Sequence, residues 1–373
     1  MGIPRQYLTL SVKSKNAVEV EEQIEEANPK APFVFPSLED FKTKRFGGFQ
    51  KLLTRSRTLI TQYDIFLDLD DEGKRRLLSA SGVGAGGFLS ALPVRADLKL
   101  KPLDFTDSVR YCLGIPTTSL LAIPCGTKCA CNKVHDYTTP SDILSCNRSG
   151  ASFWKRRHDG VARAFNKICK EALFSTKLEL RTGEDTAARV DVTVFDFPGD
   201  ERTKEGKVCE WNTVHFDVAV TDPTNASNSK HALRRASAAD AKAQKKLSSP
   251  GAKEVQEPDK FVPAIVETYG LVHISLRKAL NSIADCHIEN AVKDSGLSAM
   301  QQGFLKGSMM VRYYQLISVA LMKGVVENIR DAARHVHRCG RTRRKSPPLT
   351  TARAQGIIGA IQRFDSSGLA EFF

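Results

Sequence analysis

The sequence predicts an α/β protein in which a helix, three strands, a second helix and a fourth strand follow one another. Apolar residues at helical spacing predict the first helix, an alanine-rich basic stretch predicts the second, and alternating β-branched residues predict strands. In chain order the segments are 153–174, 177–181, 190–194, 214–220, 229–247 and 261–267. This order is typical of one sheet covered by helices, and we expect further helices on both sides of it.

Two of the predicted strands each carry one aspartate among apolar neighbours. Asp191 lies within 190–194 and Asp217 within 214–220. Because side chains alternate along a strand, the valines face one side of the sheet and the aspartate faces the other. A carboxylate in that position is exposed, paired or bound to a cation. If the strands are neighbours, the two carboxylates converge as a site for Mg2+ or Mn2+; the alternative is two ordinary solvent-facing residues.

The composition favours a nucleic acid as the partner. Lys and Arg number 55 against 42 Asp and Glu, which gives a formal net charge of +13 at pH 7, and 41% of the residues are hydrophobic. The apolar fraction is sufficient for a folded core, and the excess positive charge attracts polyanions. We expect DNA, with RNA as the alternative polyanion, and no membrane contact, because no apolar run is long enough to span a bilayer.

Four of the nine cysteines fall in one loop-rich stretch. It contains Cys125, Cys129, Cys131 and Cys146, together with His135 and Asp142. The first residues show no apolar signal segment, so we expect an intracellular protein, nuclear or otherwise, that is not secreted. Clustered thiolates in a reducing compartment are typical of a structural zinc site. The alternative is a loop with free cysteines.

Composition divides the chain into six expected parts. They are a helical N-terminal segment (1–80), a helical connector (81–124), a cysteine-rich zinc-binding module (125–150), the α/β domain (151–270), C-terminal helices (271–337) and a basic flexible tail (338–373). The connector includes GVGAGG at 82–87, which has the spacing G-x-G-x-x-G. It follows a charged helix rather than a buried strand, so we expect no small-molecule cofactor there.

Several short motifs, each weak alone, occur in an order that resembles a known family. They are GGFLSALP (86–93), RYCLGIP (110–116), CAC (129–131), LSC (144–146), RHD (157–159), VDV (190–192), FDVAVTDP (216–223) and VETYG (266–270). This order is similar to the region downstream of the reverse transcriptase in non-LTR retrotransposons that carry a restriction-like, PD-(D/E)XK endonuclease, here without the polymerase. The resemblance implies a restriction-endonuclease-like fold and Mg2+- or Mn2+-dependent cleavage of DNA.

The resemblance also implies catalytic roles. Asp191 and Asp217 would hold the metal ion. Many PD-(D/E)XK enzymes keep a lysine two residues after the second acid, where this chain has Ala219. In the retrotransposon family the lysine lies in the following helix, which implies Lys242, with Lys245 as the reserve. We add Glu171, at the edge of the apolar stripe of the first helix, to the expected catalytic set.

The same resemblance implies binding roles. Cys129, Cys131 and Cys146 would bind structural zinc, with His135 or Asp142 as the fourth ligand, because the histidine expected four residues before Cys146 is replaced by that aspartate. The expected nucleic-acid contacts are Arg157, His158, Arg234 and Arg235. Two other hypotheses remain: a catalytically inactive nucleic-acid-binding protein with the same fold, and a zinc-containing scaffold whose charge is incidental.

Overall fold

The structure is a computed structural model. It describes residues 61, 64–124, 126–129, 131, 136–137, 140–144, 146, 153–181, 189–202, 208–255, 259–292 and 296–343. The predictions for most of the N-terminal segment, for His135 and for most of the basic tail therefore lie outside the described residues.

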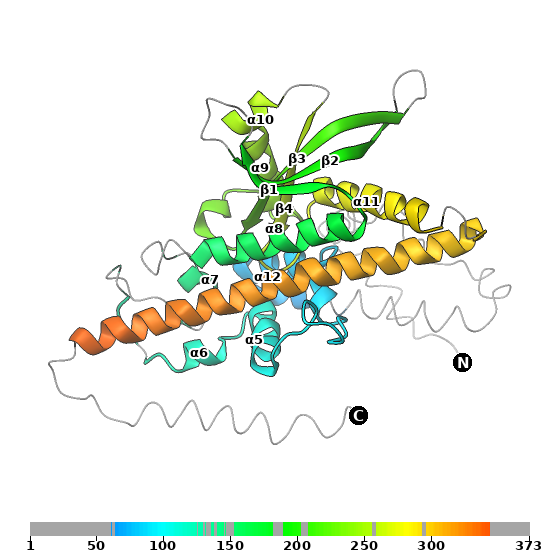
Figure 1. Cartoon of the computed structure of the whole chain (residues 1–373). Helices are drawn as coiled ribbons and strands as arrows, with labels where there is room; N and C mark the ends of the chain where they lie inside the picture. The colour runs from blue at the N-terminus through cyan, green and yellow to red at the C-terminus, as the bar shows by residue number, and fades with distance from the viewer. Residues whose placement is uncertain are drawn as a thin grey trace, which may run out of the picture.

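The protein is a mixed α/β structure, as the sequence predicts (Figure 1). In chain order the elements are α4 (Asp71–Ala80), η3 (Ala85–Phe88), α5 (Pro102–Leu113), α6 (Thr118–Leu121), α7 (Pro140–Leu144), α8 (Phe153–Glu171), β1 (Thr176–Arg181), β2 (Arg189–Arg202), β3 (Val208–Thr221), η4 (Ala226–Asn228), α9 (Ser237–Leu247), α10 (Pro250–Glu254), β4 (Lys260–Glu267), α11 (Ile274–Val292) and α12 (Ala299–Arg343). The elements from α8 to β4 follow the predicted order, with the additional short η4 and α10.

One four-stranded sheet has the order β1-β2-β3-β4. The first two pairings are antiparallel, and β3 and β4 are parallel. A parallel pair requires a crossover connection, which α9 and α10 provide. In the register of β2 with β3, Val192 lies opposite Phe216. This pairing brings the two aspartate-containing segments side by side.

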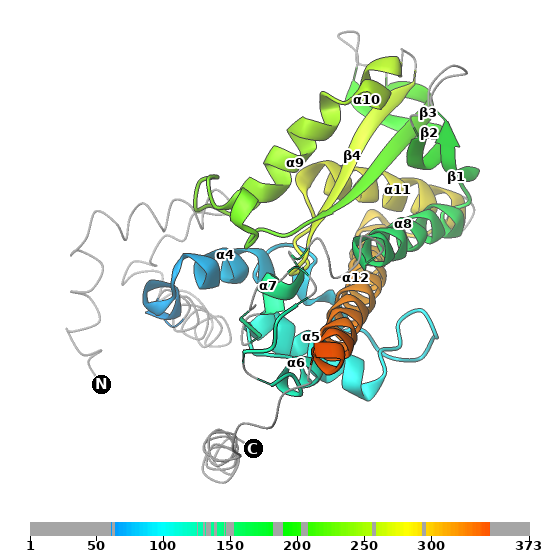
Figure 2. The ribbon, with the colours of Figure 1, turned by 90° about the vertical axis from the view of Figure 1, so that its left-hand side faces the viewer.

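Helices cover both faces of the sheet (Figure 2). On one face, Val192 and Phe216 belong to the main core together with residues of α8, α11 and α12. The rings of Phe165 on α8 and Phe216 meet edge to face, with centroids 4.8 Å apart. On the other face, α9 packs through alanines against a small second cluster that includes Ala219 and Ile265. The even and odd positions of β3 thus face different helices, as strand alternation requires.

The long helix α12 lies between α8 and the connector (Figure 1). It packs along α8 and also contacts η3, α5, α6 and α7. Tyr111 of α5 stacks on Tyr269 just after β4, with ring centroids 4.6 Å apart and planes at 8°. A single hydrophobic core includes residues from Phe88 to Val336, so the connector, the α/β segment and the C-terminal helices form one packed body. None of the helices in the described residues has the length and apolarity required to cross a membrane.

The predicted basic helix 229–247 begins later than expected, at Ser237. Residues 229–236 form turns and bends instead. Ala236 takes a left-handed conformation with φ of 63°, which prevents a continuous helix through this position.

Candidate functional site

The carboxyl groups of Asp191 and Asp217 meet at one end of the sheet. Because Val192 lies opposite Phe216, the next step of the antiparallel ladder places Asp191 opposite Asp217. Asp191 Oδ2 also accepts a hydrogen bond of 2.7 Å from the N–H of Val218. The two side chains are 19% and 13% exposed, respectively. The structure therefore brings the two predicted acids together in a mostly buried position.

Each of these carboxyl groups has a cationic partner. His158 Nε2 lies 3.1 Å from Asp191 Oδ2, and Lys246 Nζ lies 2.6 Å from Asp217 Oδ1. Burial tends to raise the pKa of Asp191, but the hydrogen bond and charge of His158 outweigh it and lower that pKa. Burial and the adjacent Asp191 raise the pKa of Asp217, although Lys246 opposes the change. The pKa of one acid is thus lowered and that of the other is raised, as expected for two carboxyl groups that share a site.

His158 contacts Asp191 directly and has two further partners. Its Nδ1 lies 3.1 Å from Asp159 Oδ1, and its Nε2 lies 3.0 Å from the carbonyl oxygen of Val218. Burial lowers the pKa of His158, but the hydrogen bonds and charges of Asp191 and Asp159 outweigh it and raise that pKa to about 9. The ring is therefore protonated at neutral pH and donates through both nitrogens.

An open cleft of about 340 Å³ surrounds the two acids. Its lining combines acidic and basic side chains from α8, the strands and α9: Lys155, Arg157, His158, Asp159, Glu179, Arg189, Asp191, Asp217, Val218, Ala219, Val220, Lys242 and Lys246. The first turns of α8 form one wall, and the C-terminal half of α9 forms the other. A cleft that combines basic side chains with two mostly buried carboxylates can bind a polyanion and a cation together.

The lysines of α9 that line the cleft are Lys242 and Lys246. They are four positions apart, so they lie on the same face of the helix. Lys245 lies one position earlier than Lys246, is exposed and is not part of the cleft lining. Burial lowers the pKa of Lys242, and the charges of the neighbouring lysines add to this effect. Sequence reasoning missed Lys246, although its i+4 spacing from Lys242 was a usable signal.

Glu171 lies outside the cleft lining. It occupies the last position of α8 and accepts hydrogen bonds from Arg312 at 3.0 Å and from Arg95 at 3.2 Å. It therefore links α8 to α12 and to the connector. The prediction that Glu171 joins Asp191 and Asp217 in the catalytic set is therefore not supported by its position in the structure.

The structure also separates the predicted nucleic-acid contacts. Arg157 and His158 line the cleft, whereas Arg234 and Arg235 do not. Arg234 Nη1 lies 2.7 Å from Asp240 Oδ2, and Arg235 Nη2 donates to Ser81 Oγ at 3.2 Å. Because α9 begins only at Ser237, these two arginines lie before its first turn, at the end opposite Lys246.

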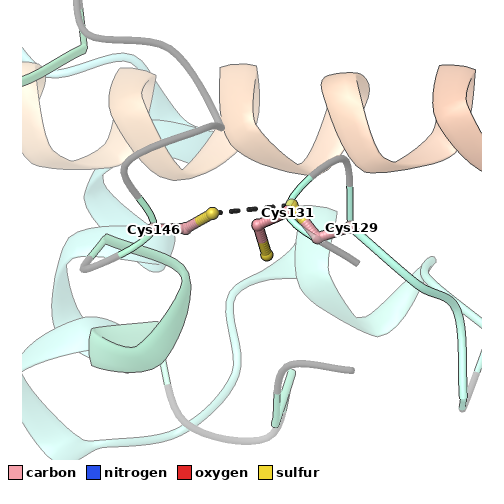
Figure 3. Close-up of side chains that lie close together, drawn as sticks. All are labelled: Cys129, Cys131 and Cys146. Atoms are coloured by element: carbon pink, nitrogen blue, oxygen red, sulfur yellow. Dashed lines mark hydrogen bonds between the residues drawn. The ribbon is translucent and has the colours of Figure 1, made fainter. Parts of the chain in front are cut away.

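Three cysteines cluster in the loop-rich segment before α8 (Figure 3). The sulfur atoms of Cys129, Cys131 and Cys146 all lie within 4.8 Å of one another, and 3.6 Å separates Cys129 Sγ from Cys146 Sγ. Asp142 is not a member of this group, and its Oδ2 accepts from the N–H of Asp136 at 2.9 Å. His135 lies outside the described residues. A three-thiol cluster of this kind can bind a metal such as zinc, whose binding would deprotonate the thiols.

Comparison with known proteins does not place the chain in a family. No family model matches the chain, and no curated protein does. The chemistry of the cleft therefore indicates what the site can do. The relevant features are two converging carboxylates, two lysines on one helical face and a protonated histidine that binds one of the acids.

Proposed function

We propose that the protein is a Mg2+- or Mn2+-dependent DNA endonuclease of the restriction-like, PD-(D/E)XK type, related to the nuclease of non-LTR retrotransposons. The observation that carries this proposal is the meeting of Asp191 and Asp217 in a basic cleft. The order α8-β1-β2-β3-α9-β4, with one acid on each of β2 and β3, supports it, because the family resemblance implies this order. DNA is the proposed substrate, and hydrolysis of a phosphodiester bond is the proposed reaction.

The two acids that line the cleft fit a hard divalent cation. Asp191 and Asp217 supply carboxylate oxygens, which Mg2+ and Mn2+ prefer. Their proximity and burial raise the pKa of Asp217, and a cation would relieve this repulsion. When bound, such a metal ion polarises the phosphate and lowers the pKa of bound water.

The protein's own side chains would prepare the site for a phosphate. Lys246 is held 2.6 Å from Asp217, and Lys242 extends into the same cleft from the preceding turn of α9. Fixed ammonium groups stabilise negative charge that develops on a phosphate during hydrolysis. His158 holds the carboxylate of Asp191 from the opposite wall, so that its oxygens keep one orientation.

Basic residues near the acids would contact the DNA backbone. Lys155 and Arg157 come from the start of α8, and Arg189 comes from the start of β2. These charges lie on one side of the acids, and the lysines of α9 lie on the other. Phosphates on both sides of the scissile bond could thus be held at once, which positions DNA without reading its sequence.

A plasmid-nicking assay with Mg2+ or Mn2+ tests the proposal, and Asp217→Asn is the decisive variant. We expect the parent to nick the plasmid and this variant to bind DNA without nicking it.

The second candidate function is DNA binding without cleavage. It is favoured by one observation: His158 and Lys246 form ion pairs with the two acids. A parent that binds DNA but never nicks it with either metal would support this second candidate.

A further inference from the structure

Helix α9 carries both lysines of the cleft, yet its apolar contacts with the sheet are small. The buried cluster beneath it consists of Ala219, Ala239, Ala243, Ile265 and Leu271. The two members on the helix are both alanines, and an alanine buries much less apolar surface than a leucine. The position of α9 on the sheet therefore depends strongly on its polar contacts.

The N-terminus of α9 lacks a cap of its own. Ala236 occupies the N-cap position in a left-handed conformation and has no side chain that can accept a hydrogen bond. The carboxylate of Glu267 replaces the cap: its Oε1 accepts from the N–H of Ala239 at 3.2 Å. Glu267 is the last residue of β4 and is 2% exposed. An acidic group at this end also interacts favourably with the helix dipole.

A second polar contact fixes the same turn. Asp240 lies 2.9 Å from His273 Nε2, and it also pairs with Arg234. Lys242 and Lys246 follow Ala239 by three and seven residues. At a rise of about 1.5 Å per residue, the second lysine lies about 10 Å along the helix from this anchor. A small tilt of the first turn therefore moves both ammonium groups.

We propose that Glu267 is a positioning residue that holds the first turn of α9 and thereby places Lys242 and Lys246 over the paired acids. Its effect on cleavage rests on the proposed nuclease function, whereas its hold on α9 does not. Burial raises the pKa of Glu267 to about 7, and Asp222 and Asp240 lie close enough to oppose its ionisation. Burial and the two nearby acids disfavour the ionised form of this carboxyl group. Its presence at this position is consistent with a specific role of its hydrogen bond to Ala239.

Two variants and one control test the inference. Glu267→Ala removes the acceptor, whereas Glu267→Gln keeps an oxygen that can accept from Ala239. The control is Asp107→Ala on α5, because Asp107 is 1% exposed and accepts from the N–H of Thr118 at 2.9 Å, away from α9 and the cleft. The measurements are amide hydrogen exchange across residues 237–247, plasmid nicking and DNA affinity.

For Glu267→Ala we expect faster amide exchange in α9. Nicking should be slower by about 10- to 100-fold, because a small misplacement of the two lysines lowers the rate on this scale. DNA affinity should be nearly unchanged. We expect Glu267→Gln to resemble the parent in both measurements. The control should lose stability without either specific effect.

Unchanged exchange in α9 of Glu267→Ala would overturn the inference, whether or not the parent cuts DNA. A Gln variant as impaired as the Ala variant, or a control that slows nicking equally, would also overturn it. A parent that does not nick DNA overturns the nuclease proposal instead, and the exchange result then decides the role of Glu267 alone.

Discussion

Lys246 donates a hydrogen bond of 2.6 Å from its Nζ to Oδ1 of Asp217, and this contact joins α9 to the acid on β3. We expect Lys246→Ala to slow plasmid nicking by about 10- to 1000-fold, the scale for loss of one group that stabilises charge in the transition state. Lys242→Ala should slow nicking by a factor in the same range. Lys245→Ala is the matched control, because this lysine is exposed on another face of the same helix. Equal losses at Lys245 and Lys246 would contradict the geometry.

Asp191→Asn and Asp217→Asn should each abolish nicking, because each removes a carboxylate that would hold the metal. DNA affinity should stay unchanged or increase, since each substitution removes one negative charge from the cleft. Asp196→Asn is the control: Asp196 is exposed on the same strand as Asp191 and lies outside the cleft lining. Nicking and gel-shift titrations measure the two effects. An Asp217→Asn protein that cuts as well as the parent would show that the cleavage comes from elsewhere.

Deprotonation of His158 should lower the stability of the fold at alkaline pH. Burial lowers its pKa, but Asp191 and Asp159 outweigh burial and raise it from 6.5 to about 9. Because folding raises this pKa, protonation of His158 stabilises the fold fully below pH 6.5, the pKa of an unperturbed histidine. This stabilisation is lost as the pH rises through 9, and it amounts to about 3 kcal/mol. Chemical denaturation between pH 6 and 10 should therefore show a smaller decline for His158→Gln than for the parent.

His215 supplies the opposite control. Burial lowers the pKa of His215, so its protonation on unfolding destabilises the fold as the pH falls below 6.5. His215→Gln should therefore flatten the acidic side of the stability curve and leave the alkaline side unchanged. If both variants altered the same side, the assignment of His158 as a protonated partner of Asp191 would be wrong.

Purified protein should contain about one equivalent of zinc when chelators are omitted. Cys129→Ser should lower both the zinc content and the melting temperature, because Cys129 is buried and its Sγ lies 3.6 Å from that of Cys146. Cys286→Ser is the control, since Cys286 lies on α11 and outside the cluster. Elemental analysis and thermal unfolding measure the outcome. Less than about half an equivalent in the parent would count against a structural zinc site.

Binding of DNA should depend on the basic residues that line the cleft. Lys155→Ala and Arg189→Ala should each weaken binding to all sequences and reduce the salt dependence by about one unit. The sequence predicts such a role for Arg234 and Arg235. On the structure we expect smaller effects from these two, because one pairs with Asp240 and the other contacts Ser81. Fluorescence titrations at several salt concentrations would distinguish the residues that line the cleft from these two arginines. A larger effect from the two arginines would place the DNA near the N-terminus of α9.

The sequence alone determined the order of the main helices and strands from α8 to β4 and the grouping of the three cysteines. Periodicity of apolar residues is a local property, so it is readable without tertiary structure. The alternation of valines around Asp191 and Asp217 also predicted that each acid faces away from its inward neighbours. The pairing of β2 with β3 then brought the two acids together.

Only the tertiary structure decided which other side chains join them. The rotation of α9 about its axis selects Lys246 rather than Lys245. The left-handed conformation of Ala236 delays the start of this helix, and Arg234 pairs with Asp240 outside the cleft lining. The length of α8 places His158 and Glu171 at opposite ends of that helix, one beside Asp191 and the other beside Arg312. These outcomes depend on contacts between residues far apart in the chain. Local patterns do not encode them, because helix rotation and strand register are fixed by packing.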